Sequence, residues 1–524
     1  MKKIVIPGVI LIVLNALIFY TALPVISFRN PGLWIIILMN VIAIALIFSL
    51  GKKTSPEQVK AAKVPGLIAA VLIVFLLVGG IASSQIFHAS AYTKLLDVQM
   101  SEERDLPTVD DLDQIPLMDT ESSKVLGNRK IGALSDIVSQ FEVSDDYMTI
   151  AYHNAPVKVS ALRYASLWKW AANRGNGIPG YVIVDPNALT AEYVELEQGM
   201  KYVPSARFSE DLERHIYGKY PTVFFDTPHF EIDEEGKAYY VAPTYTYTIG
   251  LFGGKKINGA IVVDPVNGDT MRYETKDLPE WVDIVYNGDY ISKYFDIRGK
   301  LVNGFWNSIF GQKGLIESAT TVTYNSDGEE ERENDFGYVI KDNDVYVYTG
   351  VTSVTNDESN IGYYMANERS GEISLAYFES TDEDSVMRAA EGEVQEKRYR
   401  ASFPSLINID GAPAYVMVLK DNLGLVKMYA IVDASQYSHM EVSETLEGAL
   451  KAYTKGSVPD TGDLVRRDIV IRKIEFITVS GDTKVYIVDE GGNLFCGVFD
   501  ERTLLWNEGD TVSILTDGKN FRIE

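Results

Sequence analysis

Three long apolar runs open the chain, and none of them contains a charged residue. They cover residues 4–28, 33–50 and 64–87. A helix rises about 1.5 Å per residue and a hydrocarbon core is about 30 Å thick, so each run is long enough to cross a membrane. The middle run only just reaches that length. The sequence therefore predicts three N-terminal transmembrane helices within residues 1–92.

The charges beside these runs predict their orientation. Lys2 and Lys3 precede the first run, and the loop before the third run carries four lysines. The short loop between the first two runs has only Arg29. The positive-inside rule then places the N-terminus and the lysine-rich loop in the cytoplasm. We therefore expect a multi-pass protein of the cell membrane, with everything after His88 in a large extracytoplasmic region.

Beyond the third run the pattern changes to short β-branched and aromatic runs, separated by turns rich in Gly and Asp. Residues 93–125 are acidic and interrupted by prolines, which is typical of a membrane-proximal connector. Residues 126–456 predict a β-rich α+β region, and residues 467–524 predict a small β-barrel of OB or SH3-like type. Residues 457–462 would link the last two units. The predicted fold class is thus a membrane-anchored α+β protein.

One strand pattern recurs within the α+β region. Residues 180–186 read Gly-Tyr-Val-Ile-Val-Asp-Pro and residues 259–265 read Gly-Ala-Ile-Val-Val-Asp-Pro, while residues 429–434 are a looser copy. Each segment is a β-branched strand that ends in Asp, whose side chain bonds the backbone of the following turn. Hairpin-like turns precede two of the copies, at residues 233–236 and at residues 410–411. The region therefore contains internal repeats.

Two resemblances extend this picture. The order of turn, strand, strand and Val-Asp-Pro turn in residues 230–273 resembles PepSY-type modules, which implies small α+β units and a link to the inhibition or regulation of peptidases. Several short blocks also resemble a family of uncharacterised Gram-positive membrane proteins, which implies an anchored envelope protein and gives no mechanism. The blocks are Leu126–Lys130, Val138–Phe141, Thr248–Gly254, Tyr348–Ser353 and Leu419–Asp421.

Charge and cysteine content narrow the function classes. The net charge is −25, with +6 in residues 1–87 and −31 in the remainder. Such an acidic region repels nucleic acid, so no nucleic-acid partner is expected. Cys496 is the single cysteine, so no disulfide can form within the chain. A large exported region without disulfides fits a Gram-positive bacterium.

No catalytic motif stands out, and no cofactor is predicted. The five histidines are not in a metalloprotease spacing, and the glycine-rich residues 250–256 lack the P-loop pattern. His229, Glu231 and Asp233 alternate, so a strand would place them on one face as a cation site or simply as a polar face. The acidic residues at 327, 329–331 and 333 are either paired acids or solvated charges.

The densest polar constellation follows the predicted strand Val345–Tyr348. Its candidate ligand-binding residues are Thr352, Ser353, Asp357, Glu358, Ser359 and Asn360. Hydroxyls beside carboxylates suit Ca²⁺, a sugar or a peptide, although such a loop also satisfies itself through turn hydrogen bonds.

Together these patterns favour a membrane-anchored extracytoplasmic binding or scaffold protein of the bacterial cell envelope. Its expected partners, besides the bilayer, are other envelope proteins or wall polymer. One alternative is an envelope hydrolase that acts on wall polymer or peptide. Another is a PepSY-like regulator of a membrane or secreted peptidase.

Overall fold

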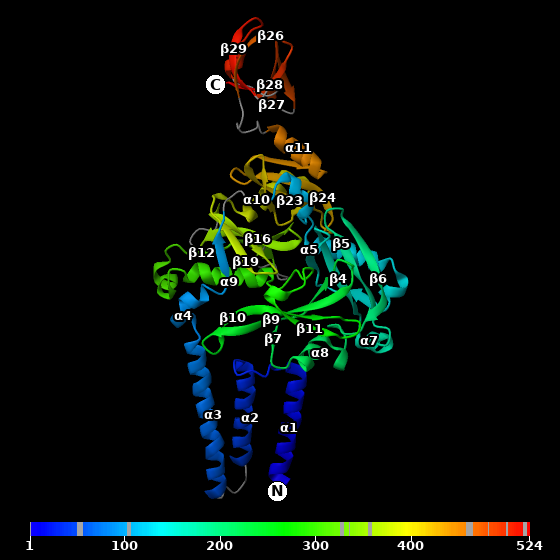
Figure 1. The fold of residues 1–524 in the computed structure, drawn as a ribbon, viewed down its shortest axis with the longest axis vertical. Helices are drawn as coiled ribbons and strands as arrows, with labels where there is room; N and C mark the ends of the chain where they lie inside the picture. Colours follow the sequence, from blue (N-terminus) through cyan, green and yellow to red (C-terminus); the bar gives the residue numbers. More distant parts are fainter. Residues whose placement is uncertain are drawn as a thin grey trace.

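Apolar helices at the N-terminus project from a β-rich body (Figure 1). The computed structural model describes residues 2–49, 56–101, 106–324, 330–334, 336–354, 359–456, 465–479, 482–498, 501–516 and 521–523. The predicted linker at residues 457–462 and the acidic positions Asp327 and Glu329 lie outside the described residues. Strand β14 (Glu330–Asn334) pairs with β13 (Thr320–Tyr324) and contains the remaining members of that acidic group.

Helices α1 (Lys2–Ala22), α2 (Pro31–Ser49) and α3 (Pro56–Ala82) are built from the apolar runs. Helix α2 packs along α3. Helix α1 meets α2 at Asn15 and Asn40, whose side-chain amides exchange hydrogen bonds of 2.6 and 2.7 Å. Each amide thereby satisfies the other, which is how polar side chains are accommodated between apolar helices.

The prediction of a three-helix transmembrane anchor is wrong. Among the described residues one helix, Lys63–Ala82, is long and apolar enough to cross a membrane, while Ile6–Ala22 and Pro31–Ile47 are shorter. The first apolar run continues to residue 28, but α1 ends at Ala22 and Leu23 takes a φ of 44°. The following residues reach the body instead, where the Ile26 N–H donates to the Pro221 carbonyl at 2.8 Å.

The third run also ends early, because its last residues form the joint to the body. Helix α3 stops at Ala82, and the hydroxyl oxygen of Ser83 accepts the N–H groups of Leu251 and Phe252 at 2.9 and 3.0 Å. These two residues form the tip of a hairpin between long strands. The fold class is thus corrected to a β-rich body with one candidate spanning helix fixed to it.

The body consists of related sheets that follow one another along the chain. The first contains β2 (Phe141–Val143), β3 (Met148–Tyr152), β4 (Ala155–Tyr164), β5 (Ile178–Asp185) and β6 (Thr190–Met200). The second contains β7 (Phe224–Phe225), β8 (His229–Ile232), β9 (Ala238–Ile249), β10 (Gly253–Val263) and β11 (Thr270–Glu274).

Two further sheets complete the body. The third contains β1 (Asp97–Met100), β12 (Ile316–Ser318), β15 (Gly337–Lys341), β16 (Asp344–Ser353), β18 (Gly362–Asn367) and β19 (Glu372–Ala376). The fourth contains β21 (Arg400–Ala401), β22 (Ser405–Ile409), β23 (Ala412–Lys420), β24 (Val426–Asp433) and β25 (Met440–Ser443). Strand β1 joins the third sheet in parallel with β19, with Asp97 opposite Glu372.

Short helices cover and connect these sheets. They are α4 (Gln85–Tyr92), α5 (Thr120–Gly132), α6 (Ser135–Val138), α7 (Leu167–Asn173), α8 (Leu212–Lys219), α9 (Gly288–Leu301), α10 (Glu383–Glu393) and α11 (Leu446–Gly456). The C-terminal strands form a sheet of their own in the order β28-β27-β26-β29-β30. They are β26 (Val465–Val479), β27 (Asp482–Asp489), β28 (Leu494–Val498), β29 (Thr511–Thr516) and β30 (Phe521–Ile523).

The repeated sequence segments occupy equivalent strands, β5, β10 and β24. An Asp that caps the next turn ends β5 and β24 and directly follows β10; Asp433 Oδ1, for example, accepts the N–H groups of Ser435 and Gln436, both at 2.8 Å. The third sheet follows the same plan with Asn367, whose Oδ1 accepts the N–H groups of Arg369 and Ser370 at 2.9 and 2.8 Å. An amide oxygen there replaces the carboxylate.

Hairpin turns join the first three sheets to one another. The turns at His153-Asn154 and Asp342-Asn343 have positive φ at both residues, as tight hairpins require. The Asn154 and Asn343 N–H groups each donate to the other's side-chain oxygen, at 2.9 and 3.0 Å. Glu234, from the second sheet, accepts from the His153 N–H at 3.0 Å and from Asn343 Nδ2 at 2.9 Å.

Candidate functional site

The structure divides the predicted polar loop between two places. Thr352 is buried in β16, opposite Glu317 of β12, and Ser353 ends the same strand opposite Ile316. Both residues therefore pair with β12 in the third sheet, and they do not line the cavity described next. Asp357 and Glu358 lie outside the described residues.

Ser359 and Asn360 form the short strand β17 and line a cavity of about 830 Å³. Their partner strand is β20 (Ser380–Thr381), so the cavity lies where the third sheet meets the fourth. Most of its lining side chains carry a hydroxyl, an amide or a charge: Ser359, Asn360, Glu379, Ser380, Thr381, Ser385, Arg388, Ser435 and Tyr437. We call this space the Asn360 cavity.

A buried carboxyl group lies behind the wall of the Asn360 cavity. Glu383 is the first residue of α10, and its Oε2 accepts a hydrogen bond from Asn360 Nδ2 at 2.8 Å. Asn360 Nδ2 also lies 3.4 Å from the Tyr415 hydroxyl, which donates to the Thr381 carbonyl at 3.0 Å. Asn360, Glu383 and Tyr415 are only 1%, 4% and 1% exposed. Burial raises the pKa of Glu383 to about 7, although the bond from Asn360 opposes the shift.

Two acceptors in this cluster have no hydrogen-bond partner among the described residues. They are Asn360 Oδ1 and Asp382 Oδ2. Buried polar atoms are nearly always paired, so unpaired acceptors mark a place where a partner is missing. Since these atoms accept hydrogen bonds, the missing partner is a donor.

Gly350 of β16 makes this arrangement possible. A Cβ atom at this position would lie 2.2 Å from Asn360 Nδ2 and 2.6 Å from Glu383 Oε1. Any larger residue would therefore separate the amide from the carboxyl group. The close approach of the backbone explains why glycine is present in the middle of a strand.

The alternating residues on β8 do not gather into a cation site. His229 Nε2 lies 2.7 Å from Glu231 Oε1, but Glu231 also accepts the N–H groups of Asp283 and Ile284 at 2.9 and 3.2 Å. Asp233 instead caps its own turn through the Lys237 N–H at 2.8 Å. In the described part of the chain, no group of three or more His, Cys, Asp or Glu residues is placed to hold a metal ion.

Glu231 and its neighbours join the sheets. Asp283 Oδ2 accepts the Ala151 N–H from the first sheet at 2.7 Å, and Glu231 belongs to the second. Burial, together with the nearby Glu231 carboxylate, raises the pKa of Asp283 well above its ordinary value. Burial also raises the pKa of Glu368, which directly follows strand β18 of the third sheet. Because they connect three sheets and lie away from the Asn360 cavity, we assign these acids a structural role.

Lys158 of β4 is the complementary buried cation. It is 2% exposed, and its Nζ donates to Thr149 Oγ1 at 2.8 Å and to Thr120 Oγ1 at 3.2 Å. Burial lowers its pKa to about 8, while the charges of Asp119 and Glu368 oppose the shift. The side chain therefore loses its proton far more easily than an exposed lysine does.

Comparisons with known proteins do not identify a family. No family model and no curated protein matches the chain. Among solved structures, a B. megaterium levansucrase mutant is 11% identical, with 81% of this chain and 95% of that chain covered, at a TM-score of 0.18. A GH43_1 enzyme from Xanthomonas citri is 11% identical, covering 70% and 89%, at a TM-score of 0.17. TM-scores this low do not establish a shared fold, so no function is transferred from these proteins.

Proposed function

We propose that this chain is a membrane-attached binding protein of the bacterial cell envelope, and that the Asn360 cavity holds its ligand. Asn360 carries the proposal, because it lines the cavity and its buried Oδ1 has no hydrogen-bond partner among the described residues. A ligand rich in O–H or N–H groups, such as a sugar or a peptide of the envelope, supplies the donors that the cluster lacks. Tyr437, which is 54% exposed, offers a ring face at the rim.

Membrane attachment rests on helix α3. Its spanning segment, Lys63–Ala82, is apolar and only 6% of its most apolar window is buried. Leu67, Val71 and Leu77 are 68%, 60% and 60% exposed, which is costly in water and favourable in lipid. The lysines that precede this segment in the sequence favour the cytoplasmic side, so the β-rich body faces the outside.

An envelope hydrolase is a second candidate because of Glu383. A carboxyl group with a pKa of about 7 exchanges a proton readily near neutral pH, as a general acid or base requires. Glu383 lies behind Asn360 and does not line the cavity, so this candidate requires Asn360 to move aside before the carboxyl group reaches a bound ligand. The PepSY-type resemblance and its link to peptidase regulation stay predictions.

Binding can be tested with two tyrosines of matched exposure. Tyr437 lines the Asn360 cavity, whereas Tyr377 is 53% exposed and does not line it. The full chain in detergent is titrated with chitotriose and with trialanine amide by calorimetry. We expect one of the two probes to bind, and Tyr437→Ala to weaken it at least tenfold while Tyr377→Ala leaves it unchanged.

Two outcomes separate the candidate functions. Equal effects of the two tyrosine substitutions, or no binding of either probe, would overturn the assignment of the cavity. Product analysis by mass spectrometry tests the hydrolase: cleavage of the bound probe that disappears in Glu383→Gln, while binding persists, favours catalysis. An intact probe after prolonged incubation favours binding alone.

A further inference from the structure

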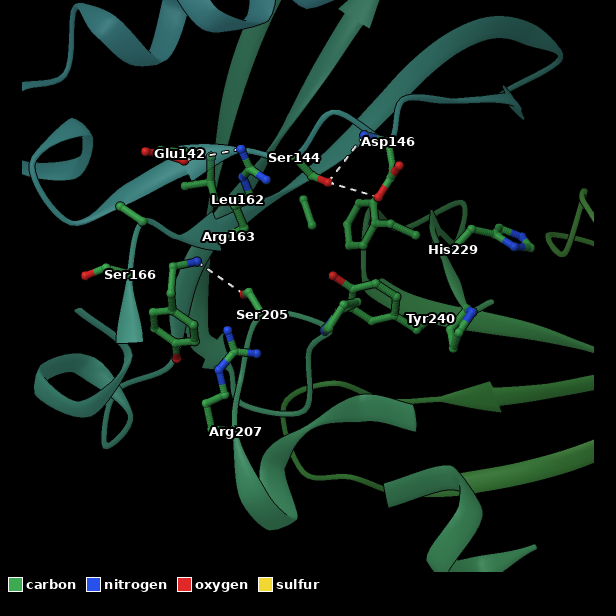
Figure 2. Close-up of a pocket in the computed structure, with 16 residues that line it drawn as sticks. Glu142, Ser144, Asp146, Leu162, Arg163, Ser166, Ser205, Arg207, His229 and Tyr240 are labelled. Atoms are coloured by element: carbon green, nitrogen blue, oxygen red, sulfur yellow. Dashed lines mark hydrogen bonds and ion pairs between the residues drawn. The ribbon is translucent and has the colours of Figure 1, made fainter. Parts of the chain in front are cut away.

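A second cavity, of about 500 Å³, opens between the first and second sheets (Figure 2). Strands β2 and β4 supply one wall, and β8, β9 and the segment at residues 204–207 supply the other. The lining includes charged, hydroxyl and aromatic side chains, among them Asp146, Arg163, Tyr164, Ser205, Arg207 and Tyr240. We call this space the Arg207 cleft.

Two opposite charges line the Arg207 cleft. Among the described residues, the guanidinium of Arg207 donates only to the neighbouring Ala206 carbonyl, at 3.4 Å. The carboxylate of Asp146 accepts, among the same residues, only from the Ser144 hydroxyl, at 3.2 Å. Neither forms an ion pair with any residue in the described part of the chain, and Figure 2 shows them on different sides of the cavity.

The other arginine of the cleft is already neutralised. Arg163 lies 3.3 Å from Glu142 and 3.5 Å from Asp145, so its charge is matched by two acids of the same sheet. Within the described residues, the cleft therefore has one cation and one anion without an ion-pair partner, and both side chains are exposed. A doubly negative phosphate would gain Arg207 but would face Asp146 and the acidic surface around it, whereas a zwitterion satisfies both charges.

The floor of the cleft is apolar. Leu162 and Phe230 are 1% and 3% exposed, and the rings of Tyr164 and Tyr240 are also buried. The Tyr164 N–H donates to Ser205 Oγ at 3.2 Å, which fixes the hydroxyl beside Arg207. Apolar side chains between two opposite charges suit a ligand with an apolar side chain on a short charged backbone.

We propose that the Arg207 cleft binds the free ends of a short peptide. The terminal carboxylate accepts a forked pair of hydrogen bonds from Arg207, which is the geometry that a guanidinium offers. The terminal ammonium pairs with Asp146, and an apolar side chain lies on Leu162 and Phe230. This site is separate from the Asn360 cavity, and it stands whether or not that cavity binds a ligand.

The test uses glycyl-leucine and glycyl-glycyl-leucine with the full chain in detergent. Calorimetry compares each free peptide with its N-acetylated form and with its C-terminal amide. We expect at least one free peptide to bind, and both blocked forms to bind at least tenfold more weakly, because each loses one charge pair.

Substitutions assign each peptide end to its residue. Arg207→Gln should remove the preference for a free carboxylate and keep the preference for a free ammonium; Asp146→Asn should do the reverse. Arg272→Gln, at an exposed arginine of β11 outside the cleft, is the matched control and should change neither preference. Melting temperatures check that every variant is folded.

Three results would overturn the proposal. In the first, neither free peptide binds at millimolar concentration. In the second, the blocked and free forms bind equally. In the third, Arg207→Gln and Asp146→Asn keep the wild-type preference for free peptide ends. None of these results bears on the Asn360 cavity, since that cavity is assigned through Tyr437→Ala and the Arg207 cleft through Arg207→Gln and Asp146→Asn.

Discussion

The buried carboxyl group of Glu383 should make the protein less stable as the pH rises. Its pKa is raised from 4.5 to about 7, so the folded state holds the proton more tightly than the unfolded chain does. The stabilisation is therefore complete below pH 4.5 and is lost as the pH rises through about 7. At about 1.4 kcal/mol per pKa unit, the loss amounts to about 3 kcal/mol.

Glu383→Gln isolates this contribution because an amide has nearly the shape of the protonated acid and never ionises. The free energy of unfolding is measured by urea titration at pH values from 4.5 to 8, and the wild-type value is subtracted from the variant value. We expect this difference to grow by about 3 kcal/mol across the range. Other titrating groups cancel in the subtraction.

Glu393→Gln is the control, because Glu393 is exposed on the same helix. Its difference from the wild type should stay flat with pH. If the Glu383→Gln difference is equally flat, the carboxyl group is hydrated in solution. The reasoning that connects it to the Asn360 cavity would then fail.

Two further predictions use the same unfolding assay. Gly350→Ala should destabilise the protein by about 2–4 kcal/mol, because the new methyl group separates Asn360 from Glu383, whereas Gly392→Ala, where a Cβ meets no atom within 4 Å, should be neutral or stabilising. Equal effects would show that the strand relaxes around the methyl group. Lys158→Met should remove a second pH dependence: with its pKa lowered to about 8, Lys158 makes the folded state gain stability as the pH rises from 8 toward 10.5. A wild-type minus Lys158→Met difference that does not rise over this range would contradict the prediction.

The repeated sheets were accessible from the sequence where local chemistry determines them. Strands β5 and β10 are β-branched runs that end in Val-Asp-Pro, and the Asp side chain caps a turn regardless of what surrounds it. The corresponding strand of the third sheet, β18, ends at Asn367, and a long insertion separates β12 from β15. The third sheet can be recognised as another copy of the repeated sheet only from the pairing of its strands.

The ends of the apolar helices could not be read from hydropathy. Leu23 and Ile26 are as apolar as the helix before them, yet this segment is held by the body through the Pro221 carbonyl. The same holds at the end of α3, where Ser83 binds a hairpin from a distant part of the chain. Such contacts depend on tertiary structure, so the composition of the apolar runs does not predict them.

The candidate site was only partly predictable for the same reason. The sequence singles out the polar loop that contains Asn360. Glu383, by contrast, has the pattern of any acidic residue at the start of a helix. Its burial follows from Asn360 and Tyr415, which reach it from other strands. Asp146 and Arg207 give no signal in the sequence, because they are distinguished by having no ion-pair partner among the described residues.

The parallel pairing of β1 with β19 sets an order of events during synthesis. Asp97 emerges from the ribosome long before its partner Glu372, and at about 5–20 residues per second the interval is tens of seconds. Throughout that time β1 is a strand without its native neighbour, directly after the apolar N-terminal helices and α4. The third sheet therefore closes only when most of the chain has been made, and a chain truncated before residue 372 would leave β1 free to pair with other proteins.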